Sequence, residues 1–152
     1  MPHRPKIVNV ESVFEDRAVL ICLRGRQTLA FATPVRKLLY WLSGKGKRHF
    51  VFDLRETTYP ADQLGPIVDN VIQAARVLPS MHIALLHTGK EPETVRYLMQ
   101  ANRRIGNKVL DVHSLEEARN WMFPGMGETD GKAAESGADN YFDLDSLDRR
   151  RA

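Results

Sequence analysis

The sequence predicts an α/β fold with a mixed, largely parallel five-stranded sheet and about four helices. Its 152 residues are about the length of one domain, and 43% of them are apolar, as in average globular proteins. Short apolar runs of strand length alternate along the chain with longer segments in which apolar residues recur at helical spacing. Strands and helices that alternate in this way form a parallel sheet.

Five segments are predicted as strands. Residues 7–14 mix polar and apolar side chains, which is typical of a strand at the edge of a sheet. Residues 18–23 and 50–54 are nearly continuous apolar runs, as in strands that are covered on both faces. Residues 83–86 and 109–112 are shorter runs of the same kind. No helix separates the first two strands, so we expect the sheet to be largely parallel after this opening pair.

Four helices are predicted, and most of their starts carry the chemistry of helix caps. Apolar stripes at helical spacing run through residues 35–42, 67–78, 95–105 and 115–122. Thr33 is the predicted N-cap of the first helix, with Pro34 as its first helical residue. Thr88–Glu91 and Ser114–Glu117 are predicted capping boxes, in which each side chain accepts a hydrogen bond from a free backbone N–H of the other residue.

Charge is divided unevenly along the chain. Residues 1–122 contain 18 Lys and Arg against 12 Asp and Glu, a net charge of +6, whereas residues 123–152 carry a net charge of −3. The basic side chains of the first part are spread over all its segments, and the densest group, residues 45–49, is typical of a solvated turn. Nucleic acid is therefore not expected as a partner.

Residues 1–122 are predicted as the α/β domain and residues 123–152 as a flexible C-terminal tail. Residues 123–142 are rich in Gly and poor in large apolar side chains, so they cannot bury enough surface to offset the entropy lost on ordering. We expect them to be a disordered linker. Residues 141–151 combine three large apolar side chains with acidic residues and a basic end, and are either a candidate docking peptide or a frayed terminus.

Two further features bear on the compartment. No apolar run reaches the roughly 18 residues that span a bilayer, and the chain opens on no signal-type apolar stretch, so a cytoplasmic protein is expected. Cys22 lies inside the apolar run 18–23, where a free cysteine behaves as a small hydrophobic residue. We expect it to pack in the core and to have no redox role.

The histidines show no helical metal-binding spacing. None has another histidine four residues away or a cysteine partner, so the sequence predicts neither a metal site nor a cofactor. His82, His87 and His113 lie at the ends of predicted strands, where we expect them to form hydrogen bonds in loops. In the alternative, His87 and His113 converge at the carboxyl ends of the parallel strands, where ligands of open α/β folds bind. An enzyme would require these two histidines and Asp53 to converge in a closed pocket. Nothing else indicates catalysis, and a non-catalytic protein is predicted.

Residues 53–65 connect a central strand to the second helix and look least like plain scaffold. Thr57, Thr58 and Asp62 place two hydroxyls and a carboxylate close to a helix N-terminus, which favours anions or phosphorylation. The same residues also have a structural explanation, in which the threonines are turn residues, Asp62 is the N-cap and Pro66 falls in the first helical turn.

Four stretches carry a pattern that extends over about residues 6–122. They are Phe50–Tyr59, Leu64–Val68, Ile83–His87 and Val109–Ala118. Together they resemble the STAS superfamily, the domain of sulphate transporters and anti-sigma factor antagonists, and within it the divergent, sporulation-antagonist-like branch that is related to lipid-binding domains. The resemblance implies a STAS-like fold and a bacterial regulatory protein whose partner is an anti-sigma factor or kinase.

One departure from the family pattern concerns phosphorylation. Antagonists of this family carry Asp-Ser-Ser-Gly before the second helix, and a serine there is phosphorylated by the anti-sigma factor kinase. The aligned stretch here, residues 61–63, is one residue shorter and has no serine. The resemblance therefore implies that the ordinary phosphoswitch is lost, with Asp62 as a permanent negative charge near the phosphoacceptor position and Thr57 and Thr58 as weaker acceptors.

Two non-catalytic hypotheses follow. In the first, the chain binds a protein partner through residues 57–63, including Gln63, and through the polar side of the second helix, including Asp69 and Arg76. In the second, it binds a small ligand or lipid. Tyr40 and Trp41 lie off the apolar stripe of the first helix and form a candidate contact patch, unless Trp41 packs at the margin of a neighbouring helix.

Overall fold

The computed structural model describes residues 4–125, and it confirms the predicted order of strands and helices. The elements are β1 (Lys6–Val13), β2 (Ala18–Arg26), α1 (Leu29–Gly44), β3 (His49–Thr58), α2 (Ala61–Ala74), β4 (His82–Leu86), α3 (Pro92–Arg104), β5 (Lys108–Val112) and α4 (Leu115–Met122). No helix within these residues is both long and apolar enough to cross a bilayer. The predicted docking peptide and the linker from residue 126 onward lie outside the described residues.

The sheet is mixed and follows the order of the chain, β1-β2-β3-β4-β5. β1 pairs antiparallel with β2, and each later strand pairs parallel with its neighbour. This confirms the expected opening pair and the parallel remainder. As a consequence, β2 to β5 all end at one edge of the sheet, called the carboxyl edge below, and all begin at the opposite, amino edge.

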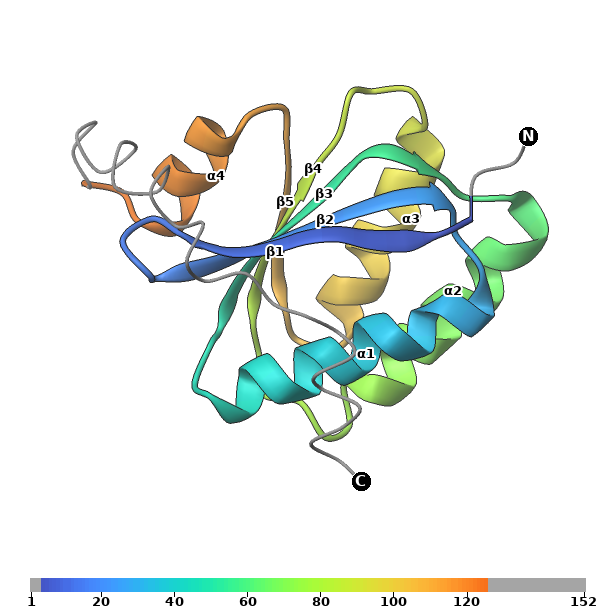
Figure 1. Cartoon of the computed structure of the whole chain (residues 1–152), viewed down its shortest axis with the longest axis horizontal. Helices are drawn as coiled ribbons and strands as arrows, with labels where there is room; N and C mark the ends of the chain where they lie inside the picture. Colours follow the sequence, from blue (N-terminus) through green and yellow to red (C-terminus); the bar gives the residue numbers. More distant parts are fainter. Residues whose placement is uncertain (1–3, 126–152) are drawn as a thin grey trace.

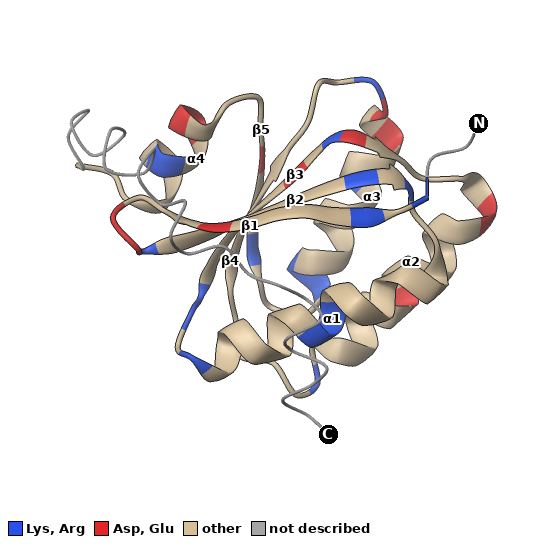
Figure 2. Cartoon of the chain, in the orientation of Figure 1, with Lys and Arg blue, Asp and Glu red and all other residues tan. Residues whose placement is uncertain are grey.

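Helices cover the two faces of the sheet unequally (Figure 1). α1, α2 and α3 pack on one face around a large apolar core that includes Leu38, Phe50 and Leu98. Of the helices in residues 4–125, α4 alone packs on the other face, over a smaller core that includes Val51, Ala84 and Met122. Lys and Arg lie on several elements and loops and do not gather on one of them (Figure 2), in agreement with the dispersed charge of the sequence.

The helix starts differ from two of the predictions. The N-cap of α1 is Thr28, whose hydroxyl accepts a hydrogen bond from the Phe31 amide at 3.2 Å, so the helix begins before Thr33 and contains Pro34. Pro34 has no N–H to donate to the carbonyl of Ala30, four residues earlier. Ala30 is exposed, so water can bind this carbonyl and the proline is tolerated. α3 begins after Glu91 without a side-chain cap, so the predicted Thr88–Glu91 box does not form.

The third predicted start is confirmed in part. Ser114 is the N-cap of α4, and its hydroxyl accepts a hydrogen bond from the Glu117 amide at 3.1 Å. The Glu117 carboxylate accepts from the amide of His113, at 3.2 Å, instead of from that of Ser114. The cap therefore also holds the residue that follows β5.

The packed domain extends past the predicted boundary at Met122. The ring of Phe123 lies 6.3 Å from that of Phe14 and 4.7 Å from that of His49, measured between centroids, and the Arg17 guanidinium lies 4.7 Å from its centroid. Phe123 was predicted to open the linker because one aromatic residue before a Gly-rich stretch gives no local signal of packing. It instead closes the amino edge of the face under α4.

Candidate functional site at the carboxyl edge

The two candidate phosphoacceptors lie in a strand and not in a loop. β3 continues through Thr57 and Thr58, which pair with Gly25 and Arg26 of β2. The Thr57 hydroxyl donates a hydrogen bond to the Leu54 carbonyl at 2.8 Å, whereas Thr58 is exposed. The prediction of a loop at these positions is therefore wrong, because pairing with β2 extends the strand beyond its apolar part.

α2 begins at Ala61, and its N-cap is Pro60, which provides no side-chain hydrogen bond. Asp62 lies in the first turn and is exposed, so it is not the N-cap that the sequence suggested. It instead belongs to the first turn, at the positive end of the helix dipole, where a negative charge is stabilised. Pro66 lies beyond the first turn, inside the helix.

The starts of α1 and α2 are joined by a side chain. The Gln63 amide oxygen accepts a hydrogen bond from the backbone N–H of Leu29, at 2.9 Å, and so satisfies a donor that α1 leaves free at its first residue. Leu29 is 42% exposed, unusually so for a large apolar residue of this domain. We call the surface formed by Leu29, Asp62 and Gln63 the α1–α2 edge.

The other two residues of the predicted partner surface lie further along α2. Asp69 is exposed and follows Asp62 by seven residues, two helical turns, so that the two carboxylates share one side of the helix. Arg76 is exposed but lies beyond the last helical residue, Ala74, at the opposite end of the element. The structure therefore groups Asp62 with Asp69 and leaves Arg76 apart.

Tyr40 and Trp41 do not form an exposed aromatic patch. Both are half-buried, and Trp41 packs against the large core. The Lys45 ammonium lies 4.5 Å from the centroid of the Trp41 ring, a cation–π contact. Trp41 therefore packs at the margin of the large core.

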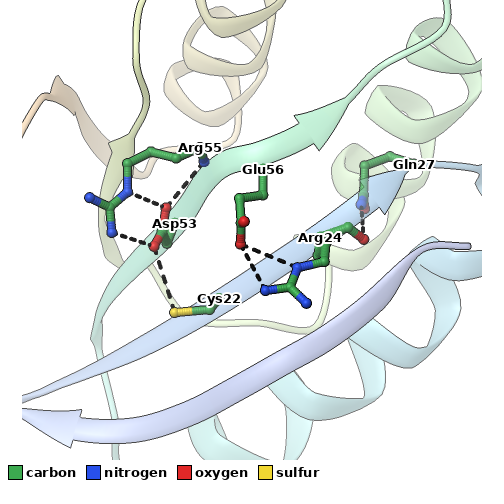
Figure 3. Close-up of polar contacts among 6 residues, drawn as sticks. All are labelled: Cys22, Arg24, Gln27, Asp53, Arg55 and Glu56. Carbon is green, nitrogen blue, oxygen red and sulfur yellow. Dashed lines mark hydrogen bonds and ion pairs between the residues drawn. The ribbon is translucent and has the colours of Figure 1, made fainter. Parts of the chain in front are cut away.

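Asp53 lies on the α4 face of the sheet, beside Cys22 and Arg55 (Figure 3). Its carboxylate accepts hydrogen bonds from the Arg55 guanidinium at 2.9 Å and from the Cys22 thiol at 3.7 Å. Although burial raises the pKa of Asp53, the hydrogen bonds and charge of Arg55 outweigh it and lower that pKa below its ordinary value. The sheet itself separates Asp53 from His87 and His113, so the convergence that an enzyme would require is not formed.

Burial and the neighbouring Asp53 raise the pKa of the Cys22 thiol from 9.0 to about 12. Cys22 is half-buried and packs against the core under α4. The thiol is therefore protonated at neutral pH, which agrees with the expected packing role. Next to it on this face, Arg24 and Glu56 form an ion pair at 3.1 Å that is largely exposed (Figure 3).

His87 and His113 converge at the carboxyl edge, which was the alternative to separate strand-end hydrogen bonds. Their ring centroids are 4.7 Å apart, and Asp111 joins them through a contact of 3.3 Å between its Oδ2 and His87 Nε2. Asp111 was missed by the sequence analysis. The available signal was its spacing of two residues from His113, which places both side chains on one side of a strand.

A cavity of about 130 Å³ lies between the sheet and the helices of the large core. Apolar side chains of the sheet and of α1 to α3 form most of its wall, and Arg36 and Asn70 contribute polar groups. Within residues 4–125 the Arg36 side chain forms no ion pair. The cavity can therefore take a small apolar group and offers one cation beside it.

No protein-family model and no curated protein sequence matches this chain. Its structure is similar to that of an anti-sigma factor antagonist from Mycobacterium paratuberculosis, with a TM-score of 0.56, over 80% of this chain and 96% of that one. The two sequences are 12% identical, so the likeness concerns the fold. The STAS-like fold expected from the sequence is confirmed: this chain has the fold of an anti-sigma factor antagonist.

Proposed function

We propose that the chain is a non-catalytic, cytoplasmic regulatory module that binds a bacterial anti-sigma factor or a related kinase through the α1–α2 edge. The fold likeness to an anti-sigma factor antagonist carries this proposal. The edge adds three properties of a reversible protein contact: an exposed apolar residue, Leu29, a fixed negative charge, Asp62, and a rigid link between two helices through Gln63.

In this proposal the module is constitutively charged and is not switched by phosphorylation. No serine occurs in residues 57–63, and the Thr57 hydroxyl is already donated to the backbone. Thr58, which is exposed, remains as the weaker acceptor. Asp62 supplies one negative charge at a helix N-terminus, where a phosphate would supply up to two charges and more acceptor oxygens.

The proposal is tested by measuring binding to anti-sigma factors recovered with the full chain by cross-linking in a bacterial host. Asp62→Ser removes the charge and restores the residue type of the family, and we expect it to change the affinity at least several-fold, or about 1 kcal/mol. The matched control is Glu93→Ser, because Glu93 occupies the same first-turn position of α3 and is also exposed. Equal affinities for the wild type and Asp62→Ser would remove Asp62 from the interface, and failure to bind any anti-sigma factor would overturn the proposal.

The cavity favours a second candidate function, the binding of a small carboxylic acid with an apolar body. Its volume, about 130 Å³, is close to that of engineered cavities that bind a single benzene ring. Arg36 lines it and forms no ion pair within residues 4–125, so a carboxylate has a partner there.

Benzoate is a suitable probe, with uncharged benzyl alcohol as its matched control. We expect benzoate to raise the melting temperature more than benzyl alcohol does, and Arg36→Gln to remove this preference. Ala74→Leu, which places a larger side chain in the wall, should abolish both effects. An unchanged melting temperature with both compounds at millimolar concentration would eliminate this candidate.

A further inference from the structure

A cluster of three metal-ligating side chains lies at the end of β4 and β5, and neither proposed function uses it. Asp111 belongs to β5, His113 follows it by two residues, and His87 directly follows β4. β4 and β5 are paired so that Leu85 lies beside Asp111 and Leu86 beside Val112. Because side chains alternate along a strand, His87, Asp111 and His113 all lie on the face covered by α1 to α3.

The donor atoms of the cluster are close enough to share one ion. One nitrogen from each histidine and one oxygen of Asp111 all lie within 4.8 Å of one another. Ligand atoms about 2.0–2.2 Å from a zinc ion at tetrahedral angles are roughly 3.3–3.6 Å apart, so small side-chain rotations complete the geometry. His113 is exposed and the Asp111 side chain is 42% exposed, which leaves an ion free to enter.

The backbone already orients His113 as a ligand. Its Nδ1 lies 3.1 Å from the His87 carbonyl oxygen, which can only accept a hydrogen bond. Nδ1 therefore carries the proton, and Nε2 keeps its lone pair for a metal. A histidine ligand whose other ring nitrogen donates to a backbone carbonyl is the common arrangement around protein-bound metals. The amide of His113 is in turn held by Glu117.

His87 must change its tautomer before it can bind a metal. Its Nδ1 accepts a hydrogen bond from the Gly89 amide at 3.0 Å, so the proton is on Nε2 and points at Asp111. Metal binding through Nε2 moves that proton to Nδ1, with no net release, and breaks the bond to Gly89. Gly89 is exposed, so water can replace the lost acceptor and the change costs little.

The geometry points to a zinc-binding site formed by His87, Asp111 and His113. Two imidazoles and one carboxylate are a ligand set of zinc sites in which a fourth position is left to water. The ion would tie the turn after β4 to the start of α4, because His113 precedes the N-cap Ser114. The site is independent of the α1–α2 edge, so either proposal can fail without the other.

Isothermal titration calorimetry of the metal-free full chain with zinc chloride tests the site. We expect one equivalent to bind with a dissociation constant at or below the micromolar range, and His113→Ala or Asp111→Asn to weaken binding at least tenfold. His82→Gln is the matched control, because it removes a half-buried histidine from the other edge of the sheet, and His3→Ala controls for the chain start; both should bind like the wild type.

NMR spectroscopy of the wild-type chain tests the same site without any variant, and so does not depend on the stability of a variant. Cobalt(II) bound at the site should broaden the ring proton signals of His87 and His113 selectively in the wild-type NMR spectrum, and leave those of His49 and His82 sharp. No zinc binding at millimolar concentration, or equal binding by His113→Ala and the wild type, would overturn the inference. Broadening confined to other histidines would do the same.

Discussion

Two pairs of histidines lie at opposite edges of the same sheet, and their surroundings differ. His49 and His82 are register partners at the amino edge, with stacked rings 4.6 Å apart that contact Phe123 and Trp121. His87 and His113 are equally close at the carboxyl edge, but they hydrogen-bond to Asp111 and to the backbone. The spacing of the rings is the same in both pairs, so the neighbours decide what each pair can do.

The difference follows from what covers each edge. The residues around α4 enclose the first pair among aromatic rings, and burial lowers the pKa of both His49 and His82 below the ordinary value. Neutral imidazoles are favoured there, and they serve packing. At the carboxyl edge the second pair has an acidic neighbour and access to solvent, which suits a ligand site. Histidines that are close in space therefore become a candidate site only where polar neighbours orient them.

The largest expected effect tests burial on the α4 face of the sheet with a different residue, Cys22. The pKa of Cys22 is raised from 9.0 to about 12, so at neutral pH its thiolate fraction is on the order of a thousandth of that of an exposed cysteine. Cys22 should therefore react on the order of a thousand times more slowly with a disulfide reagent in the folded protein than in denaturant. Asp53→Asn removes a charge that opposes the thiolate and should speed the reaction. Labelling as fast as that of a free cysteine would contradict suppression by burial.

The next effect concerns Phe123, whose ring packs against His49 of the first histidine pair. Phe123→Ala should lower the free energy of unfolding by about 2 kcal/mol, less than for a fully buried phenylalanine because the ring is half-buried. Two truncations form a matched pair for urea denaturation: a chain that ends at Met122 should be destabilised like Phe123→Ala, whereas one that ends at Gly125 should be as stable as the wild type. Equal stability of both truncations would show that Phe123 contributes nothing.

Acid should weaken the fold through His49 and His82. Since burial lowers their pKa in the folded state, the unfolded chain binds protons first as the pH falls below about 6.5. Their contribution to stability is complete above that pH and is lost as the pH falls through the lowered pKa. The urea midpoint should therefore decrease from pH 7.5 to pH 5, and His49→Phe should make this decrease smaller. An unchanged slope in His49→Phe would place the pH dependence elsewhere.

The smallest effect on the free energy of unfolding is expected at the second pair, His87 and His113. His113 is exposed and donates one side-chain hydrogen bond, so His113→Ala should change the free energy of unfolding in chelator by about 0.5 kcal/mol or less. Urea denaturation with and without zinc distinguishes a structural role of His113 from a role in zinc binding. Zinc should raise the free energy of unfolding of the wild type and not that of the variant. A loss above about 2 kcal/mol in chelator would show that the second pair is structural, like the first.

Local patterns predicted most of the fold but only part of the candidate site. Continuous apolar runs predict the buried strands, and Ser114 followed by Glu117 predicts the start of α4. The start of α1 was predicted at Thr33 and not at the true N-cap, Thr28. The residues after Thr28 are apolar, so no Glu or Gln follows it to form a capping box. Asp62 misled the prediction for α2 in the same way, since a carboxylate in the first turn resembles an N-cap in sequence. Neighbours along the chain do not distinguish these positions.

The sequence by itself determined the order of the elements and the parallel sheet, and it placed His87 and His113 after neighbouring strands, because each depends on periodicity and on where strands end. Only the tertiary structure decided which face each side chain meets. A shift of one residue along a strand reverses its face, so Asp53 lies on the α4 face with Cys22 while Asp111 joins the histidines on the other face. The link between Gln63 and Leu29 likewise spans 34 residues of chain, and only the packing of α1 beside α2 brings its two atoms together.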